Sequence, residues 1–307
     1  MMIDIHTHYV PPAFLASMGG SGTGGRAVYD VGARLEAMDA QGVDLHVVCP
    51  PPVLFGYEAP PQPAAAACRR LNDGTAELCR RHPRRFAGLG TVPLGDVRQA
   101  VAEVSYCRRE LGFPGVVLGT HVGPRYLDHP DFRPLLEAAA ALDAFVLIHP
   151  RNPPGAEAMQ DYYLGNTVGN PIDTTICIAR LIHSGTLDAL PDLRLCLAHG
   201  GGYLAFATPR LDHAWRHRTD LQSTGRMPPG EYLRRLYYDS CTHSAGLLSL
   251  LVAAVGADRV LMGSDAPQDM ADPEPLTTLA RAPGLSPSDR RLIGGANAAG
   301  LLGLSGA

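Results

Sequence analysis

The strongest constraint on the fold of this chain is a regular alternation of short apolar segments with segments of helical periodicity. Eight segments have the length and apolar content of buried strands, and seven of them are followed promptly by a predicted helix. The eight predicted strands lie within residues 2–8, 43–49, 85–92, 115–121, 144–150, 193–199, 232–241 and 259–265. This period, in a chain of 307 residues, is typical of the (β/α)8 TIM barrel. We therefore predict an α/β fold with a single domain, residues 1–307, folded as a distorted barrel.

Two loops and one competing fold bear on this prediction. Residues 19–25 are rich in glycine and are expected to form a mobile loop, a candidate lid, and residues 151–170 form a long loop excursion after the fifth strand. The competing fold is a doubly wound open sheet, which normally carries Gly-x-Gly-x-x-Gly directly after an early strand. No such motif follows residues 2–8, and the glycines of 19–25 lie too far from a strand end. The barrel is therefore the better prediction.

Histidine and aspartate stand at the ends of four predicted strands. The first strand ends in His6-x-His8, the fifth in His149, the sixth in His199 and the eighth in Asp265. Residues i and i+2 of a strand point to the same side, and the C-terminal strand ends of a barrel all meet at one mouth. Three imidazoles and one carboxylate around a divalent ion, with a position left for water, form a catalytic metal site. Zinc suits this mixed set of ligands best, and manganese or iron stays open.

Composition excludes several kinds of chemistry. All 26 basic residues are arginine, which excludes Schiff-base catalysis, a lysine general base and a carbamylated lysine between two metals. The formal charge of −4, without a basic block, argues against nucleic acid as a main partner. No secretory signal and no apolar run of roughly 20 residues is visible, so we expect neither export nor a membrane span. The seven cysteines lack C-x-x-C spacing and are typical of reduced thiols in a cytoplasmic protein.

Four short motifs follow one another along the chain, each at a predicted strand end. They are His6-x-His8, His149-Pro150, His199-Gly200-Gly201-Gly202 and Gly263-Ser264-Asp265. Together they resemble the amidohydrolase superfamily, in particular the branch that contains α-amino-β-carboxymuconate-ε-semialdehyde decarboxylase. Stretches at 38–43, 84–90, 111–116 and 119–122 extend the resemblance over nearly the whole chain. The resemblance implies a barrel with one divalent metal, non-oxidative decarboxylation of unsaturated or aromatic carboxylates, and frequent homodimers.

The resemblance also implies roles for the residues at the mouth. His6, His8, His149 and Asp265 match the metal ligands of the family. His199 matches a histidine that hydrogen-bonds the metal-bound water and transfers protons, and Asp265 is expected to relay protons as well. A metal lowers the pKa of its bound water towards neutrality, where imidazole also titrates, so the two roles are chemically compatible.

The substrate-binding residues follow from the same comparison. The family holds the substrate carboxylate with arginines, one of which crosses a dimer interface; Arg218 matches that residue, and Arg26 is the candidate for the second. Arg151 stands where the decarboxylase has tryptophan, so we expect a more polar, cationic pocket and a more anionic or more oxygenated substrate. His121 and His243, after the fourth and seventh predicted strands, are expected to face the mouth and to contact substrate.

Two alternatives to a decarboxylase stay open at the level of sequence. The same metal site would suit a hydrolase or hydratase acting on a lactone, an amide or an enol-acid, and uptake of water without CO2 release would identify it. A catalytically silent barrel is the third possibility. The presence of all five polar strand ends argues against a silent barrel, and fold analogy alone does not choose among the three.

Overall fold

The computed structural model describes residues 1–18, 28–222 and 225–303. Eight parallel strands form one sheet in the order β1-β2-β3-β4-β7-β8-β9-β10. Their bounds are β1 (Ile3–His8), β2 (Leu45–Cys49), β3 (Phe86–Gly90), β4 (Gly115–Gly119), β7 (Phe145–His149), β8 (Arg194–Leu197), β9 (Tyr237–Asp239) and β10 (Val260–Leu261). The sheet closes between its last strand and β1, where the Ile5 amide donates to the Met262 carbonyl at 2.9 Å and Thr7 forms a β-bridge with Ala266. The predicted TIM barrel is confirmed.

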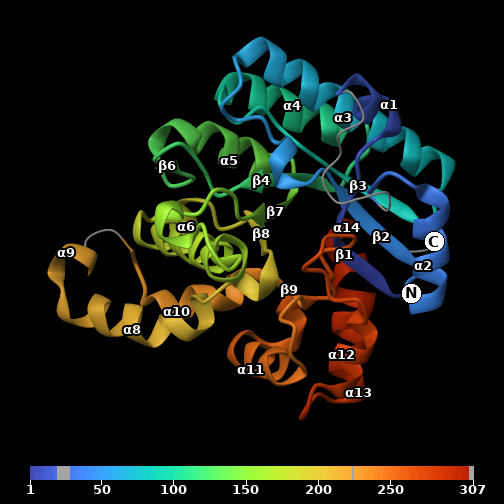
Figure 1. Ribbon diagram of the computed structural model, residues 1–307. Helices are drawn as coiled ribbons and strands as arrows, with labels where there is room; N and C mark the ends of the chain where they lie inside the picture. The colour runs from blue at the N-terminus through green and yellow to red at the C-terminus, as the bar shows by residue number, and fades with distance from the viewer. Residues whose placement is uncertain (19–27, 223–224, 304–307) are drawn as a thin grey trace.

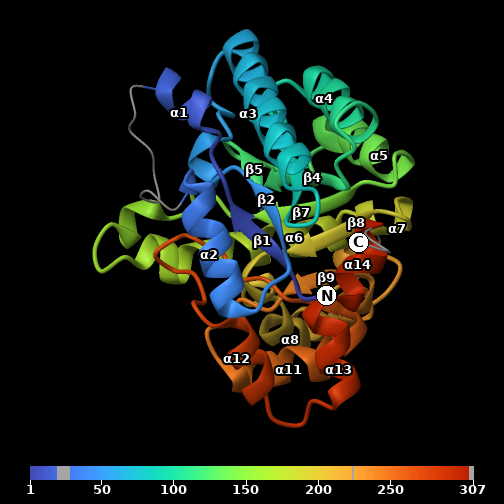
Figure 2. The ribbon, with the colours of Figure 1, turned by 90° about the vertical axis from the view of Figure 1, so that its right-hand side faces the viewer.

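Helices surround these strands on the outside (Figures 1 and 2). The longer ones are α2 (Val31–Gln41), α3 (Pro61–Arg81), α4 (Val97–Arg109), α5 (Arg133–Ala141), α6 (Asn170–His183), α8 (Leu204–His217) and α11 (Ala245–Val255). The shorter ones are α1 (Pro12–Ser17), α7 (Thr186–Ala189), α9 (Thr219–Gln222), α10 (Pro229–Tyr232), α12 (Pro275–Arg281), α13 (Pro287–Arg291) and α14 (Asn297–Leu302). Local signals set several ends. Asp96 caps α4 by accepting from the Gln99 amide, and Gly42 ends α2 in the left-handed conformation.

Strand β7 shows what holds the barrel together. Its residues Phe145, Val146, Leu147 and Ile148 are all 0% exposed, because the barrel interior covers one face and helices cover the other. Burial of each such side chain contributes about 1.5–3 kcal/mol of transfer free energy. The strand ends in His149, so this apolar packing also fixes the position of a polar side chain at the mouth.

Two predicted elements end or break earlier than expected. The fourth strand stops at Gly119, and His121 starts a separate antiparallel hairpin of β5 (His121–Val122) and β6 (Arg125–Tyr126). The sequence of residues 287–302 predicts one closing helix, but a π-helical turn, Leu292–Ala296, interrupts it. A Cβ atom at Gly295 would lie 2.1 Å from the Met1 carbonyl oxygen, so a regular helix carrying side chains does not fit against the N-terminus. Sequence periodicity does not report such a contact.

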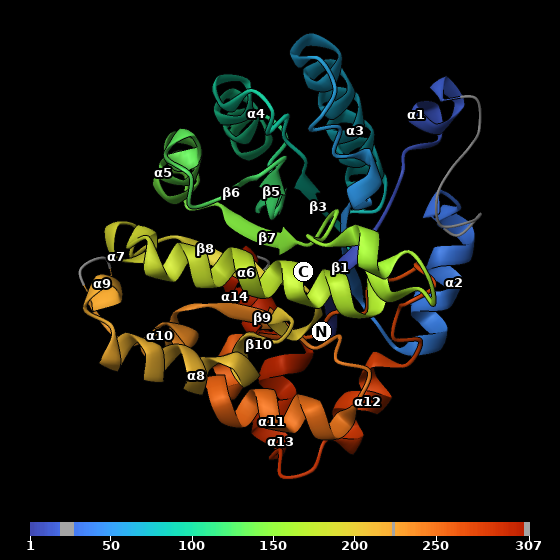
Figure 3. The same ribbon diagram turned by 60° about the vertical axis from the view of Figure 1, so that its left-hand side comes forward.

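The segment between β7 and α6 crosses the mouth of the barrel. It contains a 3-10 turn, Ala156–Met159, and a π-helical turn, Gly165–Gly169, which leads into α6. The Tyr163 hydroxyl donates to the Asp269 carboxylate at 2.8 Å and ties this segment to the loop after β10. Figure 3 shows α6 in front of the strands, with α8 and α9 extending to one side. The Gly-rich loop predicted at 19–25 lies outside the described residues.

Two predictions from composition can be compared with the structure. All seven cysteines are free thiols, and only Cys79 is not fully buried. Within residues 1–18, 28–222 and 225–303, none of the helices is both long and apolar enough to cross a membrane.

Candidate metal centre

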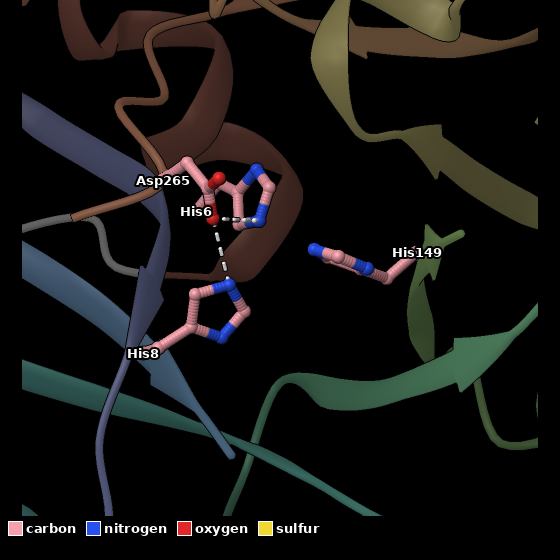
Figure 4. A group of neighbouring side chains, drawn as sticks. All are labelled: His6, His8, His149 and Asp265. Atoms are coloured by element: carbon pink, nitrogen blue, oxygen red, sulfur yellow. Dashed lines mark hydrogen bonds and ion pairs between the residues drawn. The ribbon is translucent and has the colours of Figure 1, made fainter. Parts of the chain in front are cut away.

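Four side chains from three parts of the barrel converge at its mouth (Figure 4). One ligand atom from each of His6, His8, His149 and Asp265 lies within 4.8 Å of the others. The first two come from β1, His149 ends β7, and Asp265 follows β10. Asp265 Oδ1 lies 2.8 Å from His8 Nε2 and 3.3 Å from His6 Nε2. The convergence expected from the strand ends is therefore present.

The imidazoles are oriented so that they present a nitrogen to the centre. His149 Nδ1 donates to the Pro150 carbonyl at 2.8 Å, and His6 Nδ1 donates to the Asp239 carboxylate at 2.7 Å. Both bonds leave Nε2 with a free lone pair facing inward. His149 Nε2 is buried and has no hydrogen-bond partner among the described residues. Since an unsatisfied buried polar atom costs about 1–3 kcal/mol, a divalent cation bound at this point would stabilise the cluster.

The protonation states favour a cation, with one exception. Burial, together with the neighbouring His6 and His199, holds the pKa of His149 well below its ordinary value. Burial would raise the pKa of Asp265, but the three histidines around this carboxylate keep the pKa well below its usual range. Burial would lower the pKa of His8, but Cys49 and Asp265 outweigh it and raise the pKa to about 10. A proton and a metal ion therefore compete for His8.

His199 lies beside this cluster. Its ring centroid is 5.1 Å from that of His149 and 5.3 Å from that of His6, and its Nε2 is 3.5 Å from Asp265 Oδ2. Burial disfavours the imidazolium, but the bond to Asp265 outweighs burial and raises the pKa of His199. The residue has a φ of +55°, and the three following glycines also have positive φ, so a tight left-handed turn aims the ring at the centre.

A cavity of about 570 Å³ opens next to His199. His243 lines it from the loop after β9, and Asn166 and Asn170 line it from the segment that enters α6. The remaining wall is mostly apolar and comes from the first turn of α8 and from α11. A cavity of this size and character suits a small organic ligand. The structure thus places His243 and His199 at the same opening.

Arg151 lies at the mouth beside His149. Gly119 and His149 are register partners on β4 and β7, so their Cβ directions point to the same face of the sheet. A Cβ atom at Gly119 would come within 2.7 Å of Arg151 Cδ, which places the arginine stem in the space that a side chain of Gly119 would occupy. The Arg151 side chain is 8% exposed, and its guanidinium pairs with both oxygens of Glu58 at 2.7 and 2.9 Å and lies 4.8 Å above the Tyr57 ring. Its charge is therefore already balanced.

The other predicted substrate contacts are placed differently. Both ring nitrogens of His121 lie 2.8 Å from backbone carbonyls, those of Gly123 and Arg151, so this side chain holds the β5–β6 hairpin against the mouth. Arg218 follows α8, is 63% exposed and pairs with Asp220 at 2.9 Å. The 14-residue helix separates Arg218 from the start of α8 at the cavity by about 21 Å, so Arg218 does not reach this cavity within the chain. Arg26 lies outside the described residues.

Buried aspartates that the strand-end analysis overlooked organise the mouth. Asp239 ends β9 and bonds His6, and Asp4 on β1 accepts from the Ser264 hydroxyl at 2.5 Å. Asp173 accepts from the Thr120 hydroxyl at 2.5 Å and from the Arg151 amide at 3.0 Å. An acid inside an apolar strand is a readable signal for Asp4 and Asp239. Asp173 lies in the first turn of a helix, where acids are common, and gives no such signal.

The fold and the site together define a TIM barrel with a metal-binding group at its C-terminal mouth. The chain belongs to the family described as Amidohydrolase, which it matches over residues 3–304. Among its relatives is 2-amino-3-carboxymuconate-6-semialdehyde decarboxylase of Dictyostelium discoideum, 34% identical over 277 residues, with 90% of this chain and 77% of the relative covered. Gamma-resorcylate decarboxylase of Rhizobium radiobacter is 31% identical over 299 residues, with coverage of 89% and 87%.

A solved structure bears on the cofactor. The dihydroxybenzoic acid decarboxylase of Polaromonas sp. JS666, crystallised with manganese and the inhibitor 2-nitroresorcinol, superposes with a TM-score of 0.88 at 26% identity. The superposition covers 100% of this chain and 98% of that one. The predicted membership in the amidohydrolase superfamily, with decarboxylases as relatives, is confirmed. A divalent metal is supported by this neighbour and by the cluster in the mouth, and neither selects zinc.

Proposed function

We propose that this protein is a metal-dependent, non-oxidative carboxy-lyase acting on a small unsaturated or aromatic carboxylic acid. The observation that carries the proposal is the meeting of four candidate ligands with His199 beside a ligand-sized cavity at the barrel mouth. The decarboxylase relatives at 34% and 31% identity support the reaction class. His243, Asn166 and Asn170 in the otherwise apolar cavity wall favour a ring with oxygen substituents over a purely apolar one.

In this proposal His6, His8, His149 and Asp265 hold one divalent ion, which we take to be zinc, with manganese as the alternative. When bound, the ion supplies Lewis-acid stabilisation for oxygen atoms held against it. The neutral forms of His6 and His149 suit this role, because burial lowers the pKa of both.

His199 moves the proton. As the bond between the substrate carbon and its carboxylate breaks, the electron pair stays on that carbon, CO2 leaves, and the carbon takes a proton from the His199 imidazolium, which becomes a neutral imidazole. The neutral His199 ring left behind regains a proton from water at the mouth, and the Asp265 carboxylate, 3.5 Å from His199 Nε2, relays that proton to the ring. Conjugation in the substrate spreads the negative charge that develops before protonation.

Substrate recognition is assigned to residues around the cavity and to a second copy. His243 and Arg151 contact the ring substituents, and His121 supports them from the hairpin. We further propose a cytoplasmic homodimer of single-domain chains in which Arg218 reaches the site of the partner copy and Arg26, next to the Gly-rich loop, contributes a second guanidinium. The substrate carboxylate would then meet a guanidinium, which can bond both of its oxygens.

Two measurements test this function. Metal analysis of the purified protein should find one divalent ion per chain, and incubation with 2,6-dihydroxybenzoate, related hydroxybenzoates and carboxylated dienes should release CO2. His199→Ala should retain the ion and lose about 10²–10⁴-fold in turnover. Uptake of water without CO2 release would refute the lyase assignment, and wild-type turnover in His199→Ala would refute the proton-transfer role.

A further inference from the structure

The carboxylate of Asp239 contacts both the candidate metal ligand His6 and the turn that carries His199. It is fully buried at the end of β9 and accepts four hydrogen bonds, two on each oxygen. Oδ2 accepts from His6 Nδ1 at 2.7 Å and from the His199 amide at 2.8 Å. Oδ1 accepts from the Gly200 amide at 2.7 Å and from the Cys241 amide at 3.0 Å. The full acceptor capacity of an ionised carboxylate is therefore in use.

On one side, this carboxylate fixes a candidate metal ligand. Because an ionised carboxylate only accepts, His6 Nδ1 must carry the hydrogen, and Nε2 is left as the lone-pair nitrogen that faces Asp265 and His149. The other two imidazoles have weaker outer partners, a carbonyl for His149 and the Cys49 thiol at 3.6 Å for His8. His6 is the ligand whose tautomer and ring orientation depend on a charged group.

On the other side, the same carboxylate holds the turn that carries His199. His199 has a φ of +55° and Gly200 a φ of +62°, and a left-handed conformation costs a non-glycine residue about 1–2 kcal/mol. Asp239 bonds the amides of both residues and so compensates for this conformation. The direction in which the His199 ring points is set by that turn.

We propose that Asp239 is a positioning residue that fixes the His6 tautomer and the His199 turn at once, and so couples metal binding to proton transfer. The second half of this statement rests on the proposed function, because it takes His199 as the proton-transfer group. The first half concerns metal affinity alone and stands without any assumption about the reaction.

Asp239→Asn is the decisive variant, because an amide is nearly the same size but has only one acceptor oxygen. In either orientation its NH2 group faces two N–H donors and loses two of the four bonds. We expect metal affinity, measured by competition with a chelator, to fall 10- to 100-fold. We also expect turnover at saturating metal to stay at least 10-fold below wild type, with a changed absorption spectrum of the Co²⁺-substituted protein. Equal metal affinity and an unchanged Co²⁺ spectrum would overturn the proposal that Asp239 fixes the His6 tautomer. Full recovery of turnover at saturating metal would overturn the proposal that Asp239 positions His199.

Two further variants separate these roles from a general loss of stability. Asp173→Asn removes a carboxylate that is equally buried at the mouth but contacts no candidate ligand, so its metal affinity should remain within twofold of wild type. Gly200→Ala disturbs the turn alone, because its Cβ would lie 2.9 Å from Thr242 Cγ2, and it should retain the ion while losing turnover.

Three further outcomes distinguish a specific role of Asp239 from a general loss of stability and from a failure of the proposed function. A loss of metal affinity in Asp173→Asn as large as in Asp239→Asn would overturn the specific role of Asp239. If Asp239→Asn does not fold, Asp239→Ser replaces it, because serine also removes the carboxylate, and wild-type metal affinity in that variant would contradict the role of Asp239 at His6. If the wild-type protein binds metal but releases no CO2, the proposed function fails, while the metal affinity of the Asp239 variant still tests the role of Asp239 at His6.

Discussion

Metal binding at this mouth should depend steeply on pH because of His8. In the metal-free protein Cys49 and Asp265 outweigh burial and raise the pKa of His8 to about 10, whereas burial lowers the pKa of His6 and His149. Only His8 must therefore lose a proton before the cluster can bind a cation near neutral pH. Because pH 7 lies about 3 units below this pKa, removing the His8 proton weakens the apparent free energy of metal binding by about 4 kcal/mol.

The sign of the effect differs between the metal-free protein and the metal complex. A raised pKa of His8 stabilises the metal-free fold, with the full contribution below the unfolded value near 6.5 and its loss as the pH rises through about 10. Metal affinity changes with pH in the opposite direction: it should increase about tenfold for each unit by which the pH rises between 6.5 and 8.5.

Chelator-competition titrations at pH 6.5, 7.5 and 8.5 would measure this slope. Calorimetry in buffers of different ionisation enthalpy would count the released protons, and we expect about one per ion. Cys49→Ser removes the largest contribution that raises the pKa of His8, so this variant should show a shallower slope. An apparent affinity that is constant over this range, with no proton released, would refute the competition between proton and metal.

Four substitutions test other parts of the site and fold. Asp265→Ala should lose both bound metal and turnover, and normal metal content by elemental analysis would contradict its role as a ligand. Gly119→Ala would place a Cβ atom 2.7 Å from Arg151 Cδ, so we expect a loss of about 1–3 kcal/mol in denaturant unfolding and a raised KM; unchanged values for both would refute this packing. Glu58→Gln removes the negative charge that balances the guanidinium of Arg151. Inhibition by isophthalate, which has a second carboxylate, should therefore strengthen about 10-fold relative to inhibition by benzoate. An unchanged ratio of the two inhibition constants would show that Arg151 does not face the ligand. Leu147→Ala should cost about 2–5 kcal/mol of stability without changing metal stoichiometry, and loss of the ion at equal folding would show that the core and the centre are coupled.

The barrel could be predicted from sequence because its signal is repeated. Each of the eight strands is a short apolar segment, and an error in one segment leaves the period intact. What the sequence did not predict depends on contacts between distant segments. The break at Gly295 arises from the carbonyl of Met1, and the early end of β4 accompanies the hydrogen bond of Thr120 to Asp173 on α6.

The same distinction holds within the site. The strand-end residues were predictable, since a barrel brings all C-terminal strand ends to one mouth regardless of their distance in sequence. The pairing of Arg151 with Glu58 was not predictable, because it depends on where two loops meet. The four bonds of Asp239 were not predictable either, because three of its donors are backbone amides, which carry no residue-type signal. Arg218 keeps its predicted role only in a dimer.

The charges of the mouth favour a divalent over a monovalent ion. Burial would raise the pKa of Asp239 and Asp265, but the hydrogen bonds and neighbouring histidines lower both, so the two carboxylates stay ionised inside a nearly dry site. Among the ion, Asp239 and Asp265, binding of a divalent ion with loss of the His8 proton gives two positive and two negative charges, whereas a monovalent ion would leave one of these buried negative charges uncompensated. An uncompensated buried charge is strongly unfavourable. Since the ion and these two carboxylates cancel in charge, the carboxylate substrate proposed above would be attracted by other cationic groups, and a guanidinium is the group that can bond both oxygens of a carboxylate.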